Sequence, residues 1–454
     1  MENEITNNDF IDHIQTALHD IPFYRKYYEE IKDQTHASDT LIYSGMQFIL
    51  SLGLQNASVL SEMGIVRPNI AVMGIFPSGY SKSPILNSIR KVLKFWSFGQ
   101  NNYIQSFETF SPEGMKSYLN KLSEDEKNHL YKMAILRDEV STLAKSTKNG
   151  MMSVSGLEFL SNLLDGRVEQ HDTRISGHET FPEEIYCPMW FTGTSGFWTH
   201  ITSDWWNQGI AFRMLYPLMG DMDTRGIKLQ DSNNTLDKLK PVLDILTTIT
   251  NFIWNDDFKE LYERRTHEIK VMQSQAIIQG KSEDKDIQYY KKYPELILKL
   301  AMIHKVAMMT PPKKISIPNE MNARYELLLT KEDFQWAEKD FEMYREGFIQ
   351  AYNSYLDAQS ERYKRVDTST LENKFMKYYE MVKDKKLTYT TNEDNSITKD
   401  EKGEWLKLSD ICRFANFNGF DKDTVMKSLL TKGLIIQERC INYHYEVIMV
   451  KLVQ

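Results

Sequence analysis

The stretch from Asn69 to Leu93 constrains the fold of this chain more than any other. It begins with the short apolar run Asn69–Gly74 and continues through a turn rich in Pro, Ser and Gly. It then carries apolar residues at helical spacing: Ile85, Leu86, Ile89 and Leu93. A short apolar run between turn residues is typical of a buried strand, and the later spacing is typical of a helix. The sequence therefore predicts a strand, a loop and a helix in direct succession.

Three further apolar runs predict buried strands with helical stretches between them. They are Met133–Leu136, Pro188–Phe191 and Phe212–Tyr216. Short strands that alternate with helices form a parallel sheet, because each crossover helix packs on a face of the sheet. Ligands in such sheets bind beyond the carboxyl ends of the strands. We therefore expect an α/β core over residues 65–235, with its site at that edge.

The regions on either side of this core have different patterns. Residues 1–64 have apolar residues three and four apart, which predicts a helical N-terminal region. Residues 236–381 show long helical periodicities and few strand signals, which predicts a helical domain. Residues 382–404 are polar and have little to bury, which predicts a linker. Residues 405–454 contain two short helical stretches followed by two alternating runs, a pattern typical of a winged helix.

Composition excludes several classes of protein. The chain has 454 residues, of which 41% are hydrophobic, so it is long enough for a large core and smaller domains. A formal charge of −8 argues against a wholly basic nucleic-acid coat. The three cysteines, Cys187, Cys412 and Cys440, form no CxxC pair, and the ten histidines show no paired spacing. The sequence therefore indicates neither a disulfide framework nor a zinc site built from protein ligands alone.

The sequence also predicts a cytoplasmic protein that does not enter a membrane. Its longest apolar stretches fall short of the ~20 residues that cross a bilayer. The acidic start, Met-Glu-Asn-Glu, lacks the basic and apolar regions of a signal peptide.

The loop after the first predicted strand has the parts of a phosphate-binding loop. In such loops backbone N–H groups converge on phosphates, glycines allow a positive φ, a lysine neutralises phosphate oxygens and a hydroxyl binds magnesium. Phe76 and Ser81 stand where the commonest form has its first and last glycine. The alternative is a surface turn in which Ser83 caps the helix. The residues expected to hold the phosphates are Gly79, Tyr80, Ser81, Lys82 and Ser83.

Two adjacent acids, Asp138 and Glu139, end the second predicted strand. An Asp at such a position can hold the magnesium shell, and the Glu after it can accept a proton from the water that attacks the γ-phosphate. Taken alone, an acidic pair after a strand is more often a solvated loop or a helix cap. Together with the upstream loop, the pair predicts a site for ATP and Mg²⁺. Ser83 and Asp138 would bind the metal, and Glu139 would be the catalytic base.

Two later segments add candidates to this site. Thr192 and Thr194 follow the third predicted strand, where their hydroxyls could sense the γ-phosphate, although hydroxyls beside glycines also form turns. Arg213 enters the fourth apolar run. An arginine that acts on a neighbouring subunit's nucleotide would stabilise transition-state charge and couple hydrolysis to assembly. The alternative for Arg213 is a pair with a local carboxylate.

Taken in order, these segments resemble a family of RecA-like P-loop ATPases, of the helicase-like or primase-associated kind, common on plasmids, phages and integrated elements. The resemblance spans residues 65–310. The chain departs from the family at Ser81 and at Lys299, where the family tends to carry Arg. The short segments that carry the resemblance are Pro77–Pro84, Thr109–Met115, Asp138–Ser141, Leu164–Gly166, Thr192–Gly196, Gly209–Leu215 and Tyr293–His304.

The resemblance implies a RecA-like core that hydrolyses ATP with Mg²⁺. It also implies a DNA helicase or related replication motor on single-stranded or fork DNA, and assembly into a homo-oligomer such as a hexameric ring. Two other functions use the same segments. One is a DNA-binding initiator or regulator that uses nucleotide binding as an assembly switch, and the other is a packaging or defence ATPase. A primase is disfavoured, because no catalytic domain has room before residue 65.

Residue-level support for DNA lies mainly in the C-terminal region. Winged helices contact DNA phosphates through cations, but they also bind proteins, and scattered cations are ordinary on a surface. The cations expected to contact DNA are Arg413, Lys422, Lys427, Lys432 and Arg439.

An aromatic group in the core region gives two alternatives. Its rings could stack on single-stranded bases, or they could belong to a core or a subunit interface, which is more common. The group consists of Phe197, Trp198, Trp205 and Trp206.

Overall fold

The computed structural model divides the chain into two compact units, Met1–Tyr355 and Leu356–Gln454. The boundary falls within the long helix α14 (Lys331–Arg365), and the predicted boundaries at residues 64 and 235 both fall inside the first unit. Among the described residues, no helix is both long enough and apolar enough to cross a membrane. The structure describes residues 7–80, 82–96, 103–108, 111–140, 154–167, 172–173, 177–178, 181–207, 209–219, 239–281, 283–309, 325–365, 368–385, 387–392, 396–400, 403–415, 417, 419–442 and 445–453.

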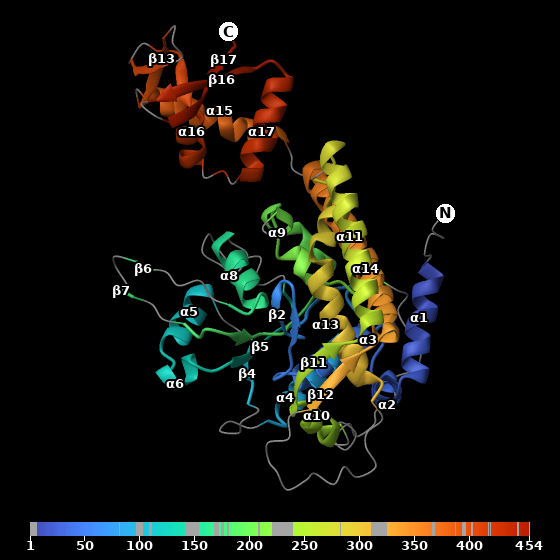
Figure 1. The fold of residues 1–454 in the computed structure, drawn as a ribbon. Helices are drawn as coiled ribbons and strands as arrows, with labels where there is room; N and C mark the ends of the chain where they lie inside the picture. Colours follow the sequence, from blue (N-terminus) through green and yellow to red (C-terminus); the bar gives the residue numbers. More distant parts are fainter. Residues whose placement is uncertain are drawn as a thin grey trace. The chain divides into compact units, whose positions relative to one another are not determined.

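A parallel sheet forms the core of the first unit (Figure 1). Its strands stand in the order β10–β3–β9–β5–β4, and β8 (Ile185–Tyr186) pairs with β5. All pairs in it are parallel. The predicted parallel α/β sheet is therefore confirmed, with a strand in each of the four predicted runs. The bounds of the strands are β3 (Ala71–Ile75), β4 (Gln105–Phe107), β5 (Tyr131–Arg137), β9 (Met189–Gly193) and β10 (Met214–Leu215).

The order of this sheet decides which loops become neighbours. β3 is followed by the predicted phosphate loop, and β5 ends at the predicted acidic pair. β9 lies between them and pairs with both. Every residue of β3 and β9 is buried, as expected of central parallel strands that are covered on both faces. The carboxyl ends of all three strands therefore lie side by side. We call this side of the sheet the carboxyl edge.

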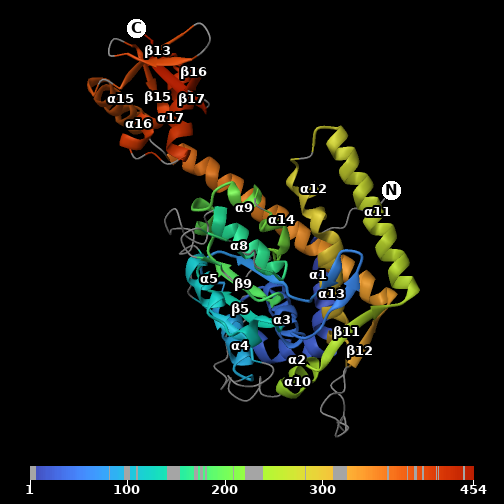
Figure 2. The same ribbon diagram turned by 60° about the vertical axis from the view of Figure 1, so that its left-hand side comes forward.

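Helix α3 (Asp39–Gly53) is the central helix of this unit. It is buried from Thr40 to Gly53 and contacts β3, because a helix that is apolar on most sides is stable only inside a core. The helices that pack around it include α1 (Asn7–Asp20), α2 (Pro22–Ile31), α4 (Ser83–Leu93), α10 (Lys240–Leu246) and α13 (Tyr293–Ala307). Helices α5 (Pro112–Asn120), α6 (Glu124–Lys127), α8 (Val154–Leu164) and α9 (Asp204–Asn207) also belong to this unit (Figure 1), and Figure 2 shows α5, α8 and α9 from another side.

A buried carboxylate ties α14 to the N-terminal helices. Asp340 is completely buried and lies 2.8 Å from the His13 Nε2 of α1. It also accepts hydrogen bonds from Tyr43 (2.9 Å) and Gln47 (2.7 Å) of α3. Because a buried carboxylate is costly unless it is hydrogen-bonded, this network fixes the register of α14 against α1 and α3.

A second sheet lies in the first unit, with the strand order β12–β11–β1–β2. Its strands are β1 (Val59–Ser61), β2 (Gly64–Val66), β11 (Ile249–Trp254) and β12 (Tyr325–Leu329). β1, β11 and β12 lie in the regions that were predicted to be helical, and for these strands that prediction was wrong; Ile65 and Val66 of β2 lie in the predicted α/β core, but no strand was predicted there. Runs of three to six residues are too short for strand alternation to be told from helical spacing. Helices α11 (Asp256–Ile278) and α12 (Lys285–Tyr289) follow β11.

The aromatic group around Trp206 belongs to the core. Its four members, Phe197, Trp198, Trp205 and Trp206, are at most 3% exposed. Trp206 stacks on Trp198 and Tyr216 and meets Phe348, Tyr352 and Tyr355 of α14. Base stacking on these rings is therefore excluded, and the core alternative is confirmed.

The described residues of the second unit comprise the end of α14, three further helices and an antiparallel sheet of order β14–β13–β15–β17–β16. Two helices followed by a hairpin lie where the sequence predicted them, and α15 (Thr368–Asp384) precedes them. Their shared core includes Phe375, Leu406, Ile411, Val425 and Val450. The elements are β13 (Thr388–Thr391), β14 (Ile397–Lys399), β15 (Trp405–Lys407), α16 (Leu408–Ala415), α17 (Gly419–Thr431), β16 (Ile435–Asn442) and β17 (Tyr445–Leu452).

Residues 382–404 are not a linker. They contain β13 and β14, and β13 pairs with β15 beside the core hairpin. Thr388 is buried, and Tyr389 lies 4.6 Å from the Lys407 ammonium. The composition misled the prediction because strand pairing uses backbone groups, and threonine-rich strands suit a pleated, half-buried surface.

Candidate nucleotide-binding site

The loop between β3 and α4 places Lys82 and Ser83 at the carboxyl edge of the parallel sheet. α4 begins at Ser83, with a proline in its first turn. Gly79 has a φ of +96°, a left-handed conformation that favours glycine. The buried Phe76 ring stacks on Tyr80 with 5.5 Å between centroids. Phe76 therefore anchors the loop where the commonest form has glycine; Ser81 lies outside the described residues.

Lys82 is largely buried at the base of this loop. It is 8% exposed, and its Nζ lies 3.4 Å from the Pro77 carbonyl oxygen. Burial lowers the pKa of Lys82, and the carboxylates of Glu139 and Asp138 partly oppose this shift. The ammonium is therefore partly desolvated and within electrostatic reach of both acids. A cation in this state gains more from a nearby anion than a solvated surface lysine does.

The Asp138 carboxylate accepts hydrogen bonds from hydroxyl groups on two different elements. Ser83 Oγ donates to Asp138 Oδ2 at 3.4 Å, and Thr192 Oγ1 donates to Asp138 Oδ1 at 3.0 Å. Thr192 is completely buried near the end of β9, where it pairs with Gly74 of β3. The order of the strands therefore brings together three predicted residues that are far apart in sequence.

Glu139 has a strained backbone. Its φ is +52°, and it is the one residue other than glycine with a positive φ in the described part of the chain. Such a conformation costs about 1–3 kcal/mol and persists only where surrounding contacts enforce it. Here Val140 N–H donates to the Thr192 carbonyl oxygen at 2.8 Å. A Cβ at Gly193 would lie 2.9 Å from Val140 Cγ1, so this close approach requires glycine.

The oxygen atoms at this edge fit a magnesium ion. Magnesium at nucleotide sites takes one or two protein oxygens and completes its shell with phosphate oxygens and water. The Ser83 hydroxyl and the Asp138 carboxylate are hard oxygen donors and already lie 3.4 Å apart. Over the described residues, no three His, Cys, Asp or Glu side chains group into a metal site. The fit therefore depends on a nucleotide that supplies the remaining oxygens.

Thr194 and Thr192 play different parts in the structure. Thr194 is half-buried and directly follows β9, as the residue before the short 3-10 helix η2 (Ser195–Thr199). It lies at the same edge as Lys82. The Thr192 hydroxyl, in contrast, is already engaged by Asp138.

Arg213 lies at the amino ends of the parallel strands, on the opposite side of the sheet from Lys82. We call this side the amino edge. It precedes β10, and Met214 pairs with Ala71, the first residue of β3. Since parallel strands rise ~3.3 Å per residue, Arg213 lies roughly 15 Å from the loop at the other end of β3. Its guanidinium pairs with Asp165 through two contacts of 2.8 Å and donates to the Gly209 carbonyl oxygen at 2.9 Å. Within one chain, Arg213 thus pairs with a local carboxylate, as the alternative to a catalytic role predicted.

Further ion pairs extend this amino edge. Lys292 lies 3.5 Å from Asp165 and 3.2 Å from Glu295, and Lys299 lies 2.7 Å from Glu295. Burial alone would raise the pKa of Glu295, but Lys299 and Lys292 outweigh it and hold the pKa at about 2. The buried Lys299 therefore serves an ion pair. Sequence reasoning missed this network, because its members come from segments far apart and follow no local pattern.

The five cations predicted to contact DNA lie on several elements of the second unit. Arg413 is on α16, Lys422 and Lys427 are on α17, Lys432 follows α17, and Arg439 is on β16. Arg413 lies 3.3 Å from Asp410, and Lys432 lies 2.7 Å from Glu372 of α15. The charge of Lys432 is therefore largely neutralised.

Sequence reasoning also missed cations that lie over aromatic rings in the second unit. Lys385 lies 4.2 Å from the Phe414 ring, on which Arg413 also lies, at 5.0 Å. Lys374 lies 4.9 Å from the Phe417 ring. A cation beside a half-buried ring suits contact with a nucleic acid, but it also occurs on ordinary surfaces.

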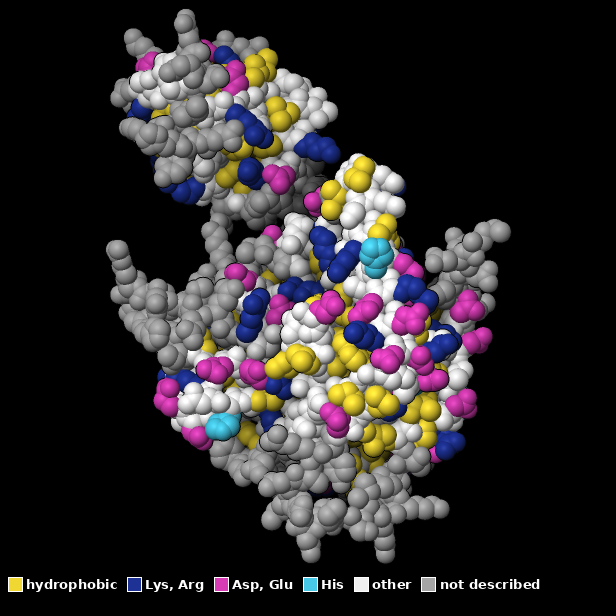
Figure 3. All heavy atoms as spheres, viewed as in Figure 1, with side chains coloured by type: hydrophobic (Ala, Val, Ile, Leu, Met, Phe, Trp, Pro, Cys, Tyr) yellow, Lys and Arg dark blue, Asp and Glu magenta, His cyan; other side chains and the backbone are white. Residues whose placement is uncertain are grey.

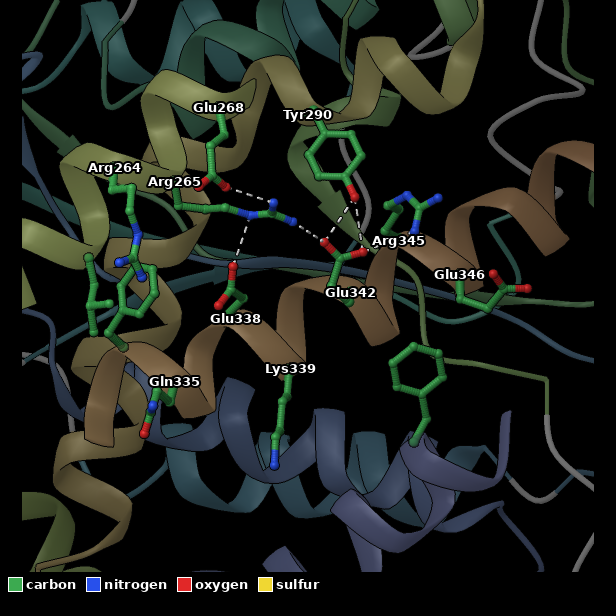
Figure 4. Close-up of a pocket in the computed structure, with 13 residues that line it drawn as sticks. Arg264, Arg265, Glu268, Tyr290, Gln335, Glu338, Lys339, Glu342, Arg345 and Glu346 are labelled. Atoms are coloured by element: carbon green, nitrogen blue, oxygen red, sulfur yellow. Dashed lines mark hydrogen bonds and ion pairs between the residues drawn. The ribbon is translucent and has the colours of Figure 1, made fainter. Parts of the chain in front are cut away.

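A wide groove of about 1220 Å³ is lined mainly by α11 and α14 (Figure 4). Arg265 points into it and pairs with Glu268, Glu338 and Glu342 at 3.0–3.5 Å. Tyr290 donates to Glu342 at 2.9 Å. These central charges satisfy one another, and the described lining places no nucleophile beside a base. The groove therefore holds a structural charge network.

Comparisons with known proteins give little information about this chain. No protein-family model matches the sequence, and no curated protein matches it. Among solved structures, the chain is similar to a full-length MCM homolog from Methanopyrus kandleri, at 10% sequence identity and a TM-score of 0.37. The match covers 76% of this chain and 63% of that one, so the chain spans less than two thirds of the MCM homolog. A similarity this weak carries no argument about function.

Proposed function

We propose that this protein is an ATP hydrolase that works with Mg²⁺ at the carboxyl edge of the parallel sheet. The observation that carries the proposal is the convergence of Lys82, Ser83, Asp138 and Glu139 from two loops that the sequence separates widely. The strained backbone of Glu139 adds support, because such strain is concentrated at functional sites.

Each residue has a role that follows from its chemistry and position. Backbone N–H groups around Gly79 and the Lys82 ammonium would hold the phosphates. Ser83 and Asp138 would hold Mg²⁺. When bound, this ion would neutralise part of the phosphate charge. Glu139 would accept the proton from the attacking water, and Thr192 keeps Asp138 oriented.

We further propose that hydrolysis is coupled to DNA, as in a helicase or related replication motor of a mobile element. The second unit supports this step, since its helices α16 and α17 and its β16–β17 hairpin suit a winged helix. Arg413, Lys427 and Arg439 are exposed on these elements. Cations exposed on such a module can contact DNA phosphates.

The test is ATP turnover by the full chain with and without single-stranded DNA. We expect turnover in the wild type, stimulation by DNA, and loss of turnover in Lys82→Ala. Lys94→Ala is a matched control, because Lys94 is exposed at the far end of the same helix. Absence of turnover in the wild type under all conditions would contradict the proposal.

A second function remains if ATP binds without turnover. The chain would then be a DNA-binding initiator or regulator in which the nucleotide acts as an assembly switch. Ser81 and Phe76, which replace two glycines of the loop, favour this alternative. Measurement of bound nucleotide alongside released phosphate separates the two functions.

A further inference from the structure

The second half of helix α11 presents aliphatic side chains to solvent at its tip. Ile277 is 65% exposed and Ile278 is 84% exposed. In the view of Figure 3, hydrophobic side chains lie at the upper end of the region where Figure 1 draws α11, with a histidine below them. The residues through which α11 is buried are Phe258, Tyr262, Ile269 and Ala276.

The exposed residues of this half form one stripe along the helix. Successive members are four, three and four residues apart, which keeps their side chains on one face. They offer an imidazole, a hydroxyl and two aliphatic groups, and none of them is an acid. The stripe consists of His267, Val271, Ser274 and Ile278, all of which are exposed.

Cations lie on both flanks of this stripe. Arg264 and Lys270 stand three residues before and three residues after His267, which turns them to opposite sides of the stripe. Lys281 follows at the tip, and all three cations are exposed. Within the described part of the chain, none of the three forms an ion pair. Their charge is therefore available to a ligand.

The acids near this surface are engaged elsewhere. Residues 269–281 contain no Asp or Glu, and Glu268, the last acid of α11, pairs with Arg265 at 3.1 Å. After the helix, Asp284 caps α12, and Glu283 lies within electrostatic reach of Lys285. In a chain with a formal charge of −8, a stripe flanked by unpaired cations favours a polyanion.

We infer that this face of α11 binds double-stranded DNA through the major groove. The inference rests on the proposed coupling to DNA, but not on ATP hydrolysis. An α-helix with its side chains is about 10–12 Å across, which matches the roughly 12 Å width of the major groove. Arg264 and Lys270 then meet phosphates of the two strands that border the groove. The stripe faces the base edges, where Ser274 can hydrogen-bond and Val271 can contact a thymine methyl group.

The side chains distinguish this target from other nucleic acids. Proteins that hold single strands stack the bases on aromatic rings, and residues 264–281 contain no Phe, Tyr or Trp. The major groove of duplex RNA is too deep and narrow for side chains to read. This face therefore fits duplex DNA. It belongs to the first unit, whereas the cations predicted to contact DNA lie in the second.

The test is the affinity of the full chain for a short mixed-sequence DNA duplex, measured by fluorescence anisotropy at several salt concentrations without nucleotide. The triple variant Arg264→Gln/Lys270→Gln/Lys281→Gln should bind at least about tenfold more weakly. Its plot of log affinity against log salt should be shallower by about 3, because each phosphate contact contributes about 1 to this slope. Its affinity for single-stranded DNA and for duplex RNA should change by less than about threefold.

A second triple variant is matched in composition and charge. Arg25→Gln/Lys94→Gln/Lys121→Gln also removes one exposed arginine and two exposed lysines, from segments outside α11. It should bind the duplex with the affinity and the salt slope of the wild type. Both variants should keep the melting temperature of the wild type, since the residues exchanged are exposed.

A second measurement locates the contact without removing a cation. The thiol of the variant Ile278→Cys should react with a maleimide about tenfold more slowly when the DNA duplex is bound, because interface side chains lose contact with solvent. Ile253→Cys is the control, since Ile253 is 42% exposed on β11, and its reaction rate should not change. The wild type gives the background from its own three cysteines.

Several results would overturn the inference. They are a wild type that binds no DNA duplex, equal binding by the first triple variant and the wild type, and an equal loss in both triple variants. An equal loss for duplex and single strand, or an Ile278→Cys thiol that the duplex leaves unprotected, would do so as well.

The proposed function fails on different results. A wild type that binds neither duplex nor single-stranded DNA would also contradict the proposed coupling to DNA. If the wild type binds DNA and the first triple variant binds it equally well, this inference alone fails. ATP turnover without DNA is measured separately and does not depend on either result.

Discussion

The two edges of the parallel sheet both gather charged residues, but they use them differently. At the amino edge, Arg213 and Asp165 form a bidentate pair, and Lys299 and Lys292 neutralise Glu295. At the carboxyl edge, Lys82 has a lowered pKa because burial outweighs the attraction of two nearby acids. Its short-range partner there is a carbonyl oxygen.

The difference separates a structural charge cluster from the edge where we propose that a nucleotide binds. Bidentate geometry at 2.8 Å completes the amino-edge pair without any further group. The carboxyl edge holds a desolvated cation, hard oxygen donors and a strained backbone, and a bound phosphate would complete them. Four substitutions test this contrast.

Glu139→Gln should have the largest effect. Removing the base should lower ATP turnover by roughly 100- to 1000-fold, while nucleotide affinity changes little. Single-turnover kinetics and titration with a fluorescent analogue measure the two quantities. Glu113→Gln, at the exposed start of α5, is the control and should turn over normally. Unchanged turnover in Glu139→Gln would assign the proton transfer to another group.

Arg213→Ala should affect stability. It leaves the partly buried Asp165 without its bidentate partner, so the free energy of unfolding should fall by about 3 kcal/mol. Nucleotide affinity should stay unchanged because the two edges are far apart. Denaturant unfolding of Arg213→Ala, Asp165→Asn and the double variant gives the coupling between them. If Arg213→Ala lost ATP turnover but kept the stability of the wild type, Arg213 would act in catalysis. That result would contradict its assignment to a structural charge pair.

The pH dependence of stability tests the Glu295 pairs. The folded-state pKa of about 2 lies below the ordinary value of 4.5, so the ionised group stabilises the fold above about pH 4.5. This contribution is lost as the pH falls towards 2. Glu295→Gln should therefore cost on the order of 2 kcal/mol at neutral pH, and the difference from the wild type should shrink below pH 4.5. A difference that stays constant between pH 7 and 3 would contradict the ion-pair account.

Gly79→Ala should give the smallest effect. Alanine at a φ of +96° is strained, so the phosphate loop should lose about fivefold to tenfold in nucleotide affinity. Gly64→Ala is the matched control, because Gly64, the first residue of β2, has a φ of +103°. It should lower stability by a similar free energy and leave affinity unchanged. Equal affinity in both variants would show that the loop conformation at Gly79 does not matter for binding.

The sequence was sufficient for strands β3, β5, β9 and β10 of the parallel sheet, but not for the short strands β4 and β8. Asn69–Gly74, Met133–Leu136 and Pro188–Phe191 are apolar runs bounded by turns, and parallel pairing then brings their carboxyl ends together. The meeting of Ser83 with Asp138 follows from that geometry.

The remaining features depend on tertiary contacts that no local pattern encodes. The partner of Arg213 is Asp165, which lies on another element, and the strain at Glu139 depends on how Val140 meets Thr192. The strands of the second sheet are too short to show a period, so β1, β2, β11 and β12 escaped prediction.

The most direct test of the central claim is a titration of the full chain with a fluorescent ATP analogue and Mg²⁺. The wild type and Lys94→Ala should bind with the same affinity, and Lys82→Ala should bind at least about 100-fold more weakly, because a desolvated cation facing the phosphates is lost. Equal affinity in Lys82→Ala and the wild type, or no binding to either, would contradict a nucleotide site at this edge.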